Sequence, residues 1–474
     1  MGRALYVHHV PTHDFDSFRA HLDLPSADES DTFSSEVLAE AQTISAARPV
    51  ATVDLTDLPF VTIDPSESLD LDQAVLIARN GEAFTVRYAI ADLGSAVPPG
   101  GAVDAEARRR GETIYLPDGR IPLHPPVLSE SALSLLPDQV RGAAVWTIEV
   151  AADGSLGEAS VQRALVRSVA RLDYATVQTG VDTGTPHPSI EPLADLGRLR
   201  RTVRLAAGAI DLALPAQEVV AGGDGWTLRL EPRTDADGWN AEISLLTGMA
   251  AARLMLDGGV GLLRTLPKPA QDDVAEFMHV AAALGIDTPP QSTPGELLAS
   301  LDPAAPATLA LMTHATALLR GAGYAAFDGK GPEEFVHAGV GGAYAHVTAP
   351  LRRLADRFGT EVCLAICADD PIPDWTRSSL PEIAEAMLAS RRRSSAADRE
   401  AVDLVETWVM QDHDGATFDA IVVRAASDDA AIFITDPPIE ARCEGAGLVD
   451  GSTITVRVHS IDADSRTVTY AVAE

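Results

Sequence analysis

Residues 62–74 read Thr62-Ile63-Asp64-Pro65-Ser66-Glu67-Ser68-Leu69-Asp70-Leu71-Asp72-Gln73-Ala74. Within this segment, Asp64, Asp70 and Asp72 place three carboxylates in nine residues. Carboxylates held a few ångströms apart repel, so either one takes up a proton at raised pKa or a divalent cation neutralises the group. The possible ligand atoms are all oxygen, which favours magnesium or manganese over zinc or copper. The segment therefore predicts a metal site.

The same segment marks the end of a strand. Residues 60–63 form a short β-rich run that Asp64-Pro65 ends, so Asp64 is expected where a strand meets a loop. Asp70 and Asp72 lie two apart, which in extended backbone points both side chains the same way. An acidic turn or cap remains an open alternative. A phosphatase-type Asp-x-Asp loop is disfavoured, because polar residues rather than a buried strand precede Asp70.

Composition bounds the class of protein. A chain of 474 residues, 46% of them hydrophobic, can hold several domains and a large core. It has no run of eighteen apolar residues, and its first residues lack the apolar core of a signal peptide. We expect a cytoplasmic protein with no membrane segment. Only three cysteines occur, Cys363, Cys367 and Cys443, so no disulfide framework is expected.

The net charge of −33 argues at first sight against a nucleic-acid partner, because affinity for phosphates grows with basic contacts. The cations are nevertheless clustered, and most are arginine, which reads phosphate bidentately. The clusters lie at residues 108–110, 198–204, 352–353 and 391–393. Each run is still more often a solvated helix face than a ligand site.

Hydrophobic periodicity predicts an α+β protein in successive segments. Strand patterns dominate from about residue 51 to 180, and helical patterns from about 190 to 410. From about 415 the sequence returns to short strands separated by turns, which suits a small all-β barrel such as an OB fold. In the helical segment, Thr348 suits an N-cap and Pro350 a first turn. Arg352 and Arg353 would then project from a helix N-terminus, where anions are favoured.

Four separated blocks, taken together, resemble a known family. They are the aspartate segment, residues 111–123 (Gly-Glu-Thr-Ile-Tyr-Leu-Pro-Asp-Gly-Arg-Ile-Pro-Leu), residues 170–174 (Ala-Arg-Leu-Asp-Tyr) and residues 344–356 (Tyr-Ala-His-Val-Thr-Ala-Pro-Leu-Arg-Arg-Leu-Ala-Asp). In this order they are similar to the catalytic RNB domain of the ribonuclease II and ribonuclease R family. The resemblance implies an RNB fold, a mixed sheet packed with helices, followed by an OB-fold RNA-binding module. It divides the chain into residues 1–50 of unknown role, 51–412 as the RNB domain and 413–474 as the OB-fold domain.

The resemblance implies a processive 3′→5′ exoribonuclease that hydrolyses single-stranded RNA to nucleoside 5′-monophosphates. Asp64, Asp70 and Asp72 would bind or orient magnesium, with manganese as the second choice. Asp72 matches the carboxylate on which cleavage depends most. Arg352 matches the arginine that holds a non-bridging phosphate oxygen and stabilises the transition state.

The remaining carried-over residues concern the RNA. Tyr115 resembles the aromatic that positions the 3′-terminal nucleotides. Tyr174 and Glu242 resemble groups near the ribose, where contacts to the 2′-hydroxyl separate RNA from DNA. Arg353 is expected to contact the RNA as well, and the protein is expected to be a monomer.

Three departures from the family pattern bear on function. Gln73 stands where the family has a fourth aspartate, and its amide is a weaker ligand. Ala349 replaces a serine of the signature. About 50 residues precede the RNB-like segment, too few for the family's two N-terminal cold-shock modules, so we expect a short form of the family. The alternative is therefore a catalytically weakened RNA-binding protein on the same fold.

Overall fold

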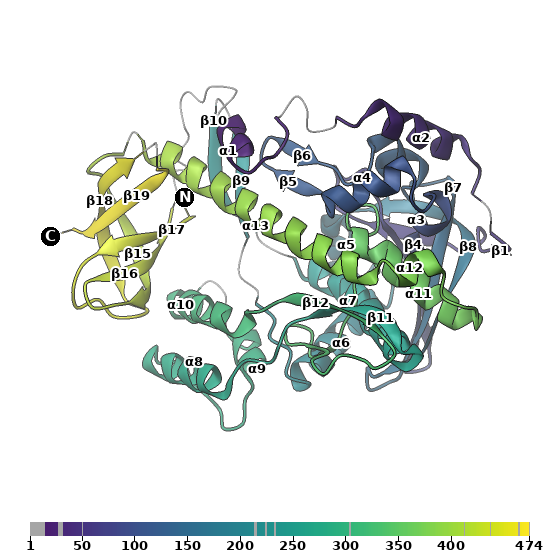
Figure 1. Cartoon of the computed structure of the whole chain (residues 1–474). Coiled ribbons are helices and arrows are strands. Elements are labelled where there is room, and N and C mark those ends of the chain that lie inside the picture. Colours follow the sequence, from purple (N-terminus) through teal and green to yellow (C-terminus); the bar gives the residue numbers. More distant parts are fainter. Residues whose placement is uncertain are drawn as a thin grey trace.

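The computed structural model describes residues 15–26, 32–49, 51–212, 216–222, 225–231, 234–302, 305–411, 413–436, 438–462 and 465–473. Figure 1 shows a large α+β body connected by a long helix, α13, to a small β-barrel at the C-terminus. This arrangement confirms the predicted fold class. Among the described residues, no helix combines the length and the apolar character that a bilayer crossing requires.

The strands of the large body fall into one main sheet and several short ribbons. The main sheet contains β1 (Val53–Asp54), β2 (Phe60–Ile63), β3 (Gln73–Asn80), β4 (Ala83–Ala91), β7 (Val140–Val150) and β8 (Leu156–Leu172). The ribbons are β5 (Ile114–Leu116) with β6 (Gly119–Ile121), β9 (Ala216–Gly222) with β10 (Gly225–Glu231), β11 (Val260–Thr265) with β12 (Gly323–Asp328), and β13 (Val336–His337) with β14 (Gly342–Ala343). The segment predicted to be helical therefore also contains three ribbons, from β9 to β14.

The main sheet closes on itself. Its strand order is β1-β8-β2-β3-β4-β7, and β8 also pairs with β7. The 17-residue β8 is long enough to pair antiparallel with β7 along its first part and parallel with β2 along its last residues. On one face of this sheet, alternating apolar side chains, among them the fully buried Trp146 and Tyr88, pack in one cluster with residues of the helical segment such as Ile243 and Leu246. The aspartate segment connects β2 to β3, so this sheet fixes both of its ends.

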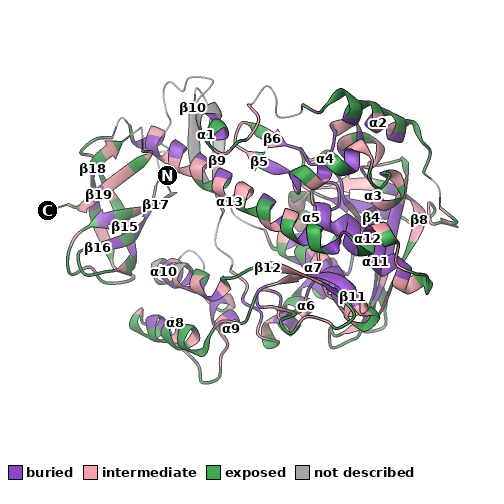
Figure 2. Ribbon diagram, viewed as in Figure 1, coloured by how far each residue is buried: buried purple, intermediate pink, exposed green. Residues whose placement is uncertain are grey.

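Helices cover the sheet and extend the core. They are α1 (Phe15–His21), α2 (Ser35–Ala46), α3 (Leu93–Ala96), α4 (Ala102–Arg110), α5 (Tyr174–Asp182), α6 (Leu193–Ala206), α7 (Asp235–Gly258), α8 (Gln271–Ala283), α9 (Pro294–Ala299), α10 (Pro306–Ala315), α11 (Leu354–Ala368), α12 (Asp374–Arg377) and α13 (Leu380–Met410). One π-helical turn (Leu128–Ala132) and two 3-10 turns (Pro188–Ile190 and Thr316–Leu319) connect them. Figure 2 shows buried residues along the sheet and along α11, which packs against α7 and β8. Most of α11 is buried, including the charged Asp356, Arg357 and Glu361, each of which has an ion-pair partner.

The C-terminal barrel contains β15 (Thr417–Ala425), β16 (Asp429–Thr435), β17 (Pro438–Glu444), β18 (Thr453–Asp462) and β19 (Thr467–Val472). It closes in the order β15-β16-β17-β19-β18, with β17 and β19 parallel and the other pairs antiparallel. Closure leaves no unpaired sheet edge. The five-stranded closed barrel confirms the predicted OB-type fold, and Figure 1 shows it beside α10 at the end of α13.

Candidate active site

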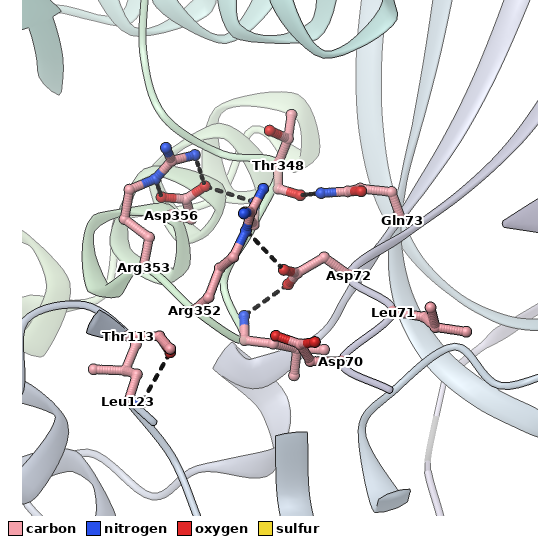
Figure 3. Close-up of polar contacts among 12 residues, drawn as sticks. Asp70, Leu71, Asp72, Gln73, Thr113, Leu123, Thr348, Arg352, Arg353 and Asp356 are labelled. Carbon is pink, nitrogen blue, oxygen red and sulfur yellow. Dashed lines mark hydrogen bonds and ion pairs between the residues drawn. The ribbon is translucent and has the colours of Figure 1, made fainter. Parts of the chain in front are cut away.

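The aspartate segment is anchored where two strands of the main sheet begin and end. The backbone N–H of Asp64 donates to the carbonyl of Leu172 at 3.1 Å, directly after β2. The carbonyl of Asp72 accepts from the N–H of Ala91 at 3.0 Å, directly before β3. Leu71 is fully buried, while Asp70 and Asp72 line a cleft of about 510 Å³, as their spacing predicts. Figure 3 shows the Leu71 side chain pointing away from the Asp72 carboxylate.

A second segment, residues 348–353, closes over the aspartates from 279 residues further along the chain. The N–H of Leu351 donates to Oδ1 of Asp72 at 2.7 Å, and Nε of Arg352 lies 3.7 Å from Oδ2 of the same carboxylate (Figure 3). The Gln73 amide donates to the carbonyl of Thr348 at 2.5 Å. Gln73 therefore ties the two segments together. Its donated hydrogen bond is one that an ionised aspartate could not make.

The prediction that Thr348 caps a helix is wrong. Helix α11 begins at Leu354, and its N-cap is Arg353 in extended conformation. Residues 349–353 form a turn, in which the N–H of Arg353 donates to the carbonyl of Ala349 at 2.9 Å. The Asp356 carboxylate holds this turn, because it accepts from the Ala349 N–H at 2.7 Å. Arg352 thus projects from a loop that precedes the helix.

Adjacent arginines have different environments. Arg353 forms an ion pair with the fully buried Asp356, with 2.5 Å between Nε and Oδ2, so its guanidinium is committed to the fold. Arg352 keeps half of its side chain exposed to the cleft, lies 3.7 Å from the Asp72 carboxylate and is also close to the Tyr115 hydroxyl. The structure therefore brings the half-exposed guanidinium of Arg352 to the aspartates. It places Arg353 at the cleft wall, with its charge already paired.

Burial makes the carboxylates of Asp64 and Asp72 poor anions in the absence of a ligand. Desolvation raises the pKa of Asp64 to about 7, with Arg352 acting in the opposite direction. Desolvation also raises the pKa of Asp72 well above its ordinary value, although Arg352 and the Leu351 N–H favour its charged form. Oδ2 of Asp64 is buried and has no hydrogen-bond partner in the described chain. Uncompensated buried oxygens of this kind are suited to receive a cation.

These donors fit a hard divalent ion with few protein ligands. Within the described residues, no three His, Cys, Asp or Glu side chains are arranged to enclose a metal. Magnesium typically keeps several waters and takes one or two carboxylates together with phosphate oxygens. The cleft offers that donor set: the unpartnered oxygen of Asp64, the carboxylate of Asp72, and room for water and phosphate.

Two tyrosines also line the cleft. Tyr115, on β5, donates its hydroxyl to Oδ2 of Asp70 at 3.3 Å, and its ring is about half exposed. Burial of the hydroxyl and the charge of Asp70 raise the pKa of Tyr115 to about 12, so the donor stays protonated. Tyr174 is the first residue of α5, which Asp173 caps by accepting from the Thr176 N–H at 2.7 Å. The exposed ring of Tyr115 offers a flat apolar face at the mouth of the cleft.

Glu242 does not reach the cleft. Its carboxylate is buried on α7 and paired with Arg204 of α6 at 2.5 Å. The same helix instead presents Asp237, Asn240 and Ser244 to the cleft. None of these three residues was predicted from the sequence. Their spacing of three and four residues is that of one helix face, which is the signal that could have found them.

The fold and the cleft define a class of protein. It is an α+β protein whose acidic cleft is suited to bind a cation and is completed by an arginine from a distant loop, and an OB-type barrel follows the large body. The model of the RNB domain matches residues 52–359, and that of the RNase II-type exonuclease C-terminal S1 domain matches residues 416–473. The chain belongs to the RNB family.

Relatives and solved structures agree with this membership. Ribonuclease R of Escherichia coli (strain K12) is 28% identical over 398 residues, covering 78% of this chain and 48% of the relative. Exoribonuclease 2 of Photorhabdus laumondii subsp. laumondii is 27% identical over 416 residues, covering 82% of this chain and 63% of the relative. The chain thus spans about half the length of the Ribonuclease R that it matches.

The fold is shared with solved structures. Mycoplasma genitalium RNase R in complex with ribose-methylated single-stranded RNA matches with a TM-score of 0.85 at 19% identity, covering 97% of this chain and 78% of that one. Yeast Ssd1, described as a pseudonuclease, matches with a TM-score of 0.72 at 17% identity, covering 95% of this chain and 59% of that one. At these identities the likeness concerns the fold.

Proposed function

We propose that the protein is a 3′→5′ exoribonuclease that hydrolyses single-stranded RNA processively to nucleoside 5′-monophosphates, with magnesium as its cofactor. The observation that carries the proposal is the approach of Arg352 to the buried carboxylate of Asp72, across 279 residues of chain. Family membership and the names of the relatives, Ribonuclease R and Exoribonuclease 2, support it. A monomeric, cytoplasmic protein with residues 1–50, 51–412 and 413–474 as its units belongs to the same proposal.

Each cleft residue has a role in this reaction. A divalent cation bound by Asp64 and Asp72, with Asp70 orienting the site, would supply an activated water and neutralise charge on the scissile phosphate. Arg352, half exposed and 3.7 Å from Asp72, can donate to a non-bridging phosphate oxygen as charge develops. Tyr115 offers its ring to a terminal base, and Tyr174 lies on the cleft wall where a ribose would fit.

A second cavity supports a path for the RNA backbone. It measures about 440 Å³ and shares Leu245, Tyr344 and Arg353 with the cleft. Arg264 and Arg391 line it as well, and no carboxylate lies within ion-pair distance of either among the described residues. In a chain of net charge −33, two such arginines beside a reaction site are suited to phosphates.

A catalytically weakened RNA-binding protein is the second candidate. Gln73 uses its amide to join Thr348, which gives the cleft one acidic ligand fewer than the family pattern. The match to Ssd1 shows that a protein described as a pseudonuclease can share this fold. The two candidates predict the same affinity for RNA and different rates of cleavage.

The experiment follows the degradation of 5′-end-labelled single-stranded RNA by the wild-type protein and by Asp72→Asn, first with magnesium and then with manganese. We expect stepwise shortening from the 3′ end by the wild type and a loss of at least about a thousandfold in Asp72→Asn, since a cleft carboxylate acts chiefly in the transition state. RNA binding, measured by anisotropy, should stay within about threefold of the wild-type value.

Asp195→Asn provides the matched control, because Asp195 is an exposed carboxylate whose ion pair with Arg79 lies outside the cleft. It should cleave as the wild type does. RNA binding without cleavage under either metal would establish the second candidate. A parallel loss of binding and cleavage in Asp72→Asn would show that the carboxylate serves the fold alone.

A further inference from the structure

The N-terminal helix α1 carries an arginine that is buried far from the RNB core. The Arg19 side chain is 1% exposed, and its Nη2 donates to Oδ1 of Asp118 at 2.6 Å. Its Nη1 donates to the carbonyl of Pro25 at 3.1 Å. A guanidinium so deeply desolvated is retained only where its partners are well placed. One of its partners, Asp118, is 99 residues away in the sequence.

Asp118 lies in the two-residue turn between β5 and β6, the hairpin that carries Tyr115. In this hairpin, Tyr115 of β5 is paired with Arg120 of β6. Both side chains reach Asp70: the Tyr115 hydroxyl at 3.3 Å and Nη1 of Arg120 at 3.7 Å. The turn that Arg19 holds therefore separates the two side chains that contact one of the cleft aspartates.

The hairpin is too small to hold its own position. Each of its strands has three residues and pairs with no other strand. A lone two-stranded hairpin is marginally stable in water, so its position must come from what it packs against. Its base is fixed by the Thr113 N–H, which donates to the carbonyl of Arg352 at 2.9 Å.

One face of the hairpin rests on α1 and α13. Ile114 and Ile121 share one apolar cluster with Phe15 and Phe18 of α1. The second half of α13 supplies further members of that cluster, among them Leu404. Figure 1 shows α1 against α13 near the hairpin. The apolar cluster determines which face of the hairpin packs against the helices, and the Arg19–Asp118 pair determines the position of its turn.

We propose that α1 is a brace for the active site: Arg19 fixes the β5–β6 turn through Asp118, so that Tyr115 and Arg120 stay in register with Asp70. Arg19 is thus a positioning residue for the cleft, and the N-terminal segment has a role in catalysis without touching RNA. The kinetic part of this inference rests on the proposed exoribonuclease activity. The structural part, restraint of the hairpin, does not.

The structural part is tested by hydrogen–deuterium exchange on Arg19→Met, which keeps the apolar stem and removes the guanidinium. Amides of residues 114–121 should exchange about tenfold faster, because local opening becomes easier by about 1.4 kcal/mol. The barrel strands, residues 417–472, should not change. Arg377→Met is the matched control, since it removes another ion pair, that with Asp328, away from the hairpin. Unchanged exchange at residues 114–121 would overturn the brace.

The kinetic part is tested in two backgrounds. Arg19→Met should lower kcat/KM by about tenfold in the wild-type protein and by less than about twofold in a Tyr115→Ala background, because the brace acts through the hairpin. Arg19→Lys should recover part of the loss. Losses that multiply in the double variant would show a general defect of folding and remove the inference.

Failures of the two proposals can be told apart. If the wild type binds RNA but does not cleave it, the exoribonuclease proposal fails, and exchange at residues 114–121 still decides whether the brace exists. If Arg19→Met does not fold, Asp118→Asn removes the same contact from its more exposed end, with Asp118 at 17% exposure. That variant should show the same faster amide exchange at residues 114–121. Wild-type protection of these amides would contradict the brace.

Discussion

The cleft and the buried ion pairs behind it use the same residue types in opposite ways. Behind the cleft, two buried ion pairs are closely matched: Glu242 with Arg204 at 2.5 Å, and Asp104 with Arg357 at 2.6 Å. In the cleft, Oδ2 of Asp64 has no hydrogen-bond partner in the described chain. Desolvated charge without a partner is unfavourable for folding, so its retention marks a site that a ligand completes. Pairing thus distinguishes these structural ion pairs from the Asp64 carboxylate of the cleft.

The largest effect is expected on the structural side, from Arg204→Met. Removal of this guanidinium leaves Glu242 buried and uncompensated, so the free energy of unfolding should fall by about 3–5 kcal/mol. Chemical denaturation measures the change. A double variant, Arg204→Met with Glu242→Met, should recover much of the loss, because a packed apolar pair can replace a buried ion pair. Equal stability of the wild type and Arg204→Met would erase the distinction between the two regions.

The next effect is expected in the cleft, from Arg352→Met. Loss of a group that donates to developing charge should slow single-turnover cleavage by about 10²–10³, or about 2.7–4 kcal/mol. Stability should change by no more than about 0.5 kcal/mol, because half of this side chain is exposed. Arg352→Lys is the control that keeps the positive charge and loses the planar guanidinium with its paired N–H donors. If binding of RNA fell as far as cleavage, the transition-state role would be wrong.

A smaller effect is expected from Tyr115→Ala. Loss of a stacking face should weaken binding of a short RNA by about 1–3 kcal/mol and lengthen the final undegraded oligonucleotide. The end products are resolved by gel electrophoresis. Tyr115→Phe keeps the ring and loses only the hydroxyl contact to Asp70, so it should leave the end product unchanged. An unchanged end product in Tyr115→Ala would remove the tyrosine from the site.

The smallest effect is expected in the pH dependence of stability. Burial raises the pKa of Asp64 to about 7, so the metal-free folded state holds this proton more tightly than the unfolded chain does. The resulting stabilisation is complete below the unfolded pKa of 3.8 and is lost as pH rises through about 7.

Thermal melting without metal tests this sign. Between about pH 5 and pH 8, the wild type should lose a few degrees of Tm relative to Asp64→Asn, which cannot ionise. Magnesium should raise the Tm of the wild type more at about pH 8 than at about pH 6, because the ion competes with the proton. A magnesium effect independent of pH would place the ion away from Asp64.

Local sequence was a good guide wherever chemistry depends on close spacing. The alternation around Leu71 predicted that Asp70 and Asp72 share one face, and the strand before Asp64 was expected from its β-rich residues. Turn residues between short strands predicted the barrel. Local pattern failed at Thr348, because Asp356 stabilises a turn where a helix cap was expected. It also failed for Glu242, since a charge on a helix face does not reveal which neighbour it meets.

The amino-acid sequence by itself determined the acidic segment, its oxygen-only donor set and the order of strands, helices and barrel, because these follow from spacing and side-chain type along a few residues. Only the tertiary structure decided which charges are paired. It brought Leu351 and Arg352 to Asp72, engaged Gln73 with Thr348, and set α1 beneath the hairpin of Tyr115. Those contacts join segments far apart in the chain, and the energy of a charge depends on neighbours and burial that arise on folding.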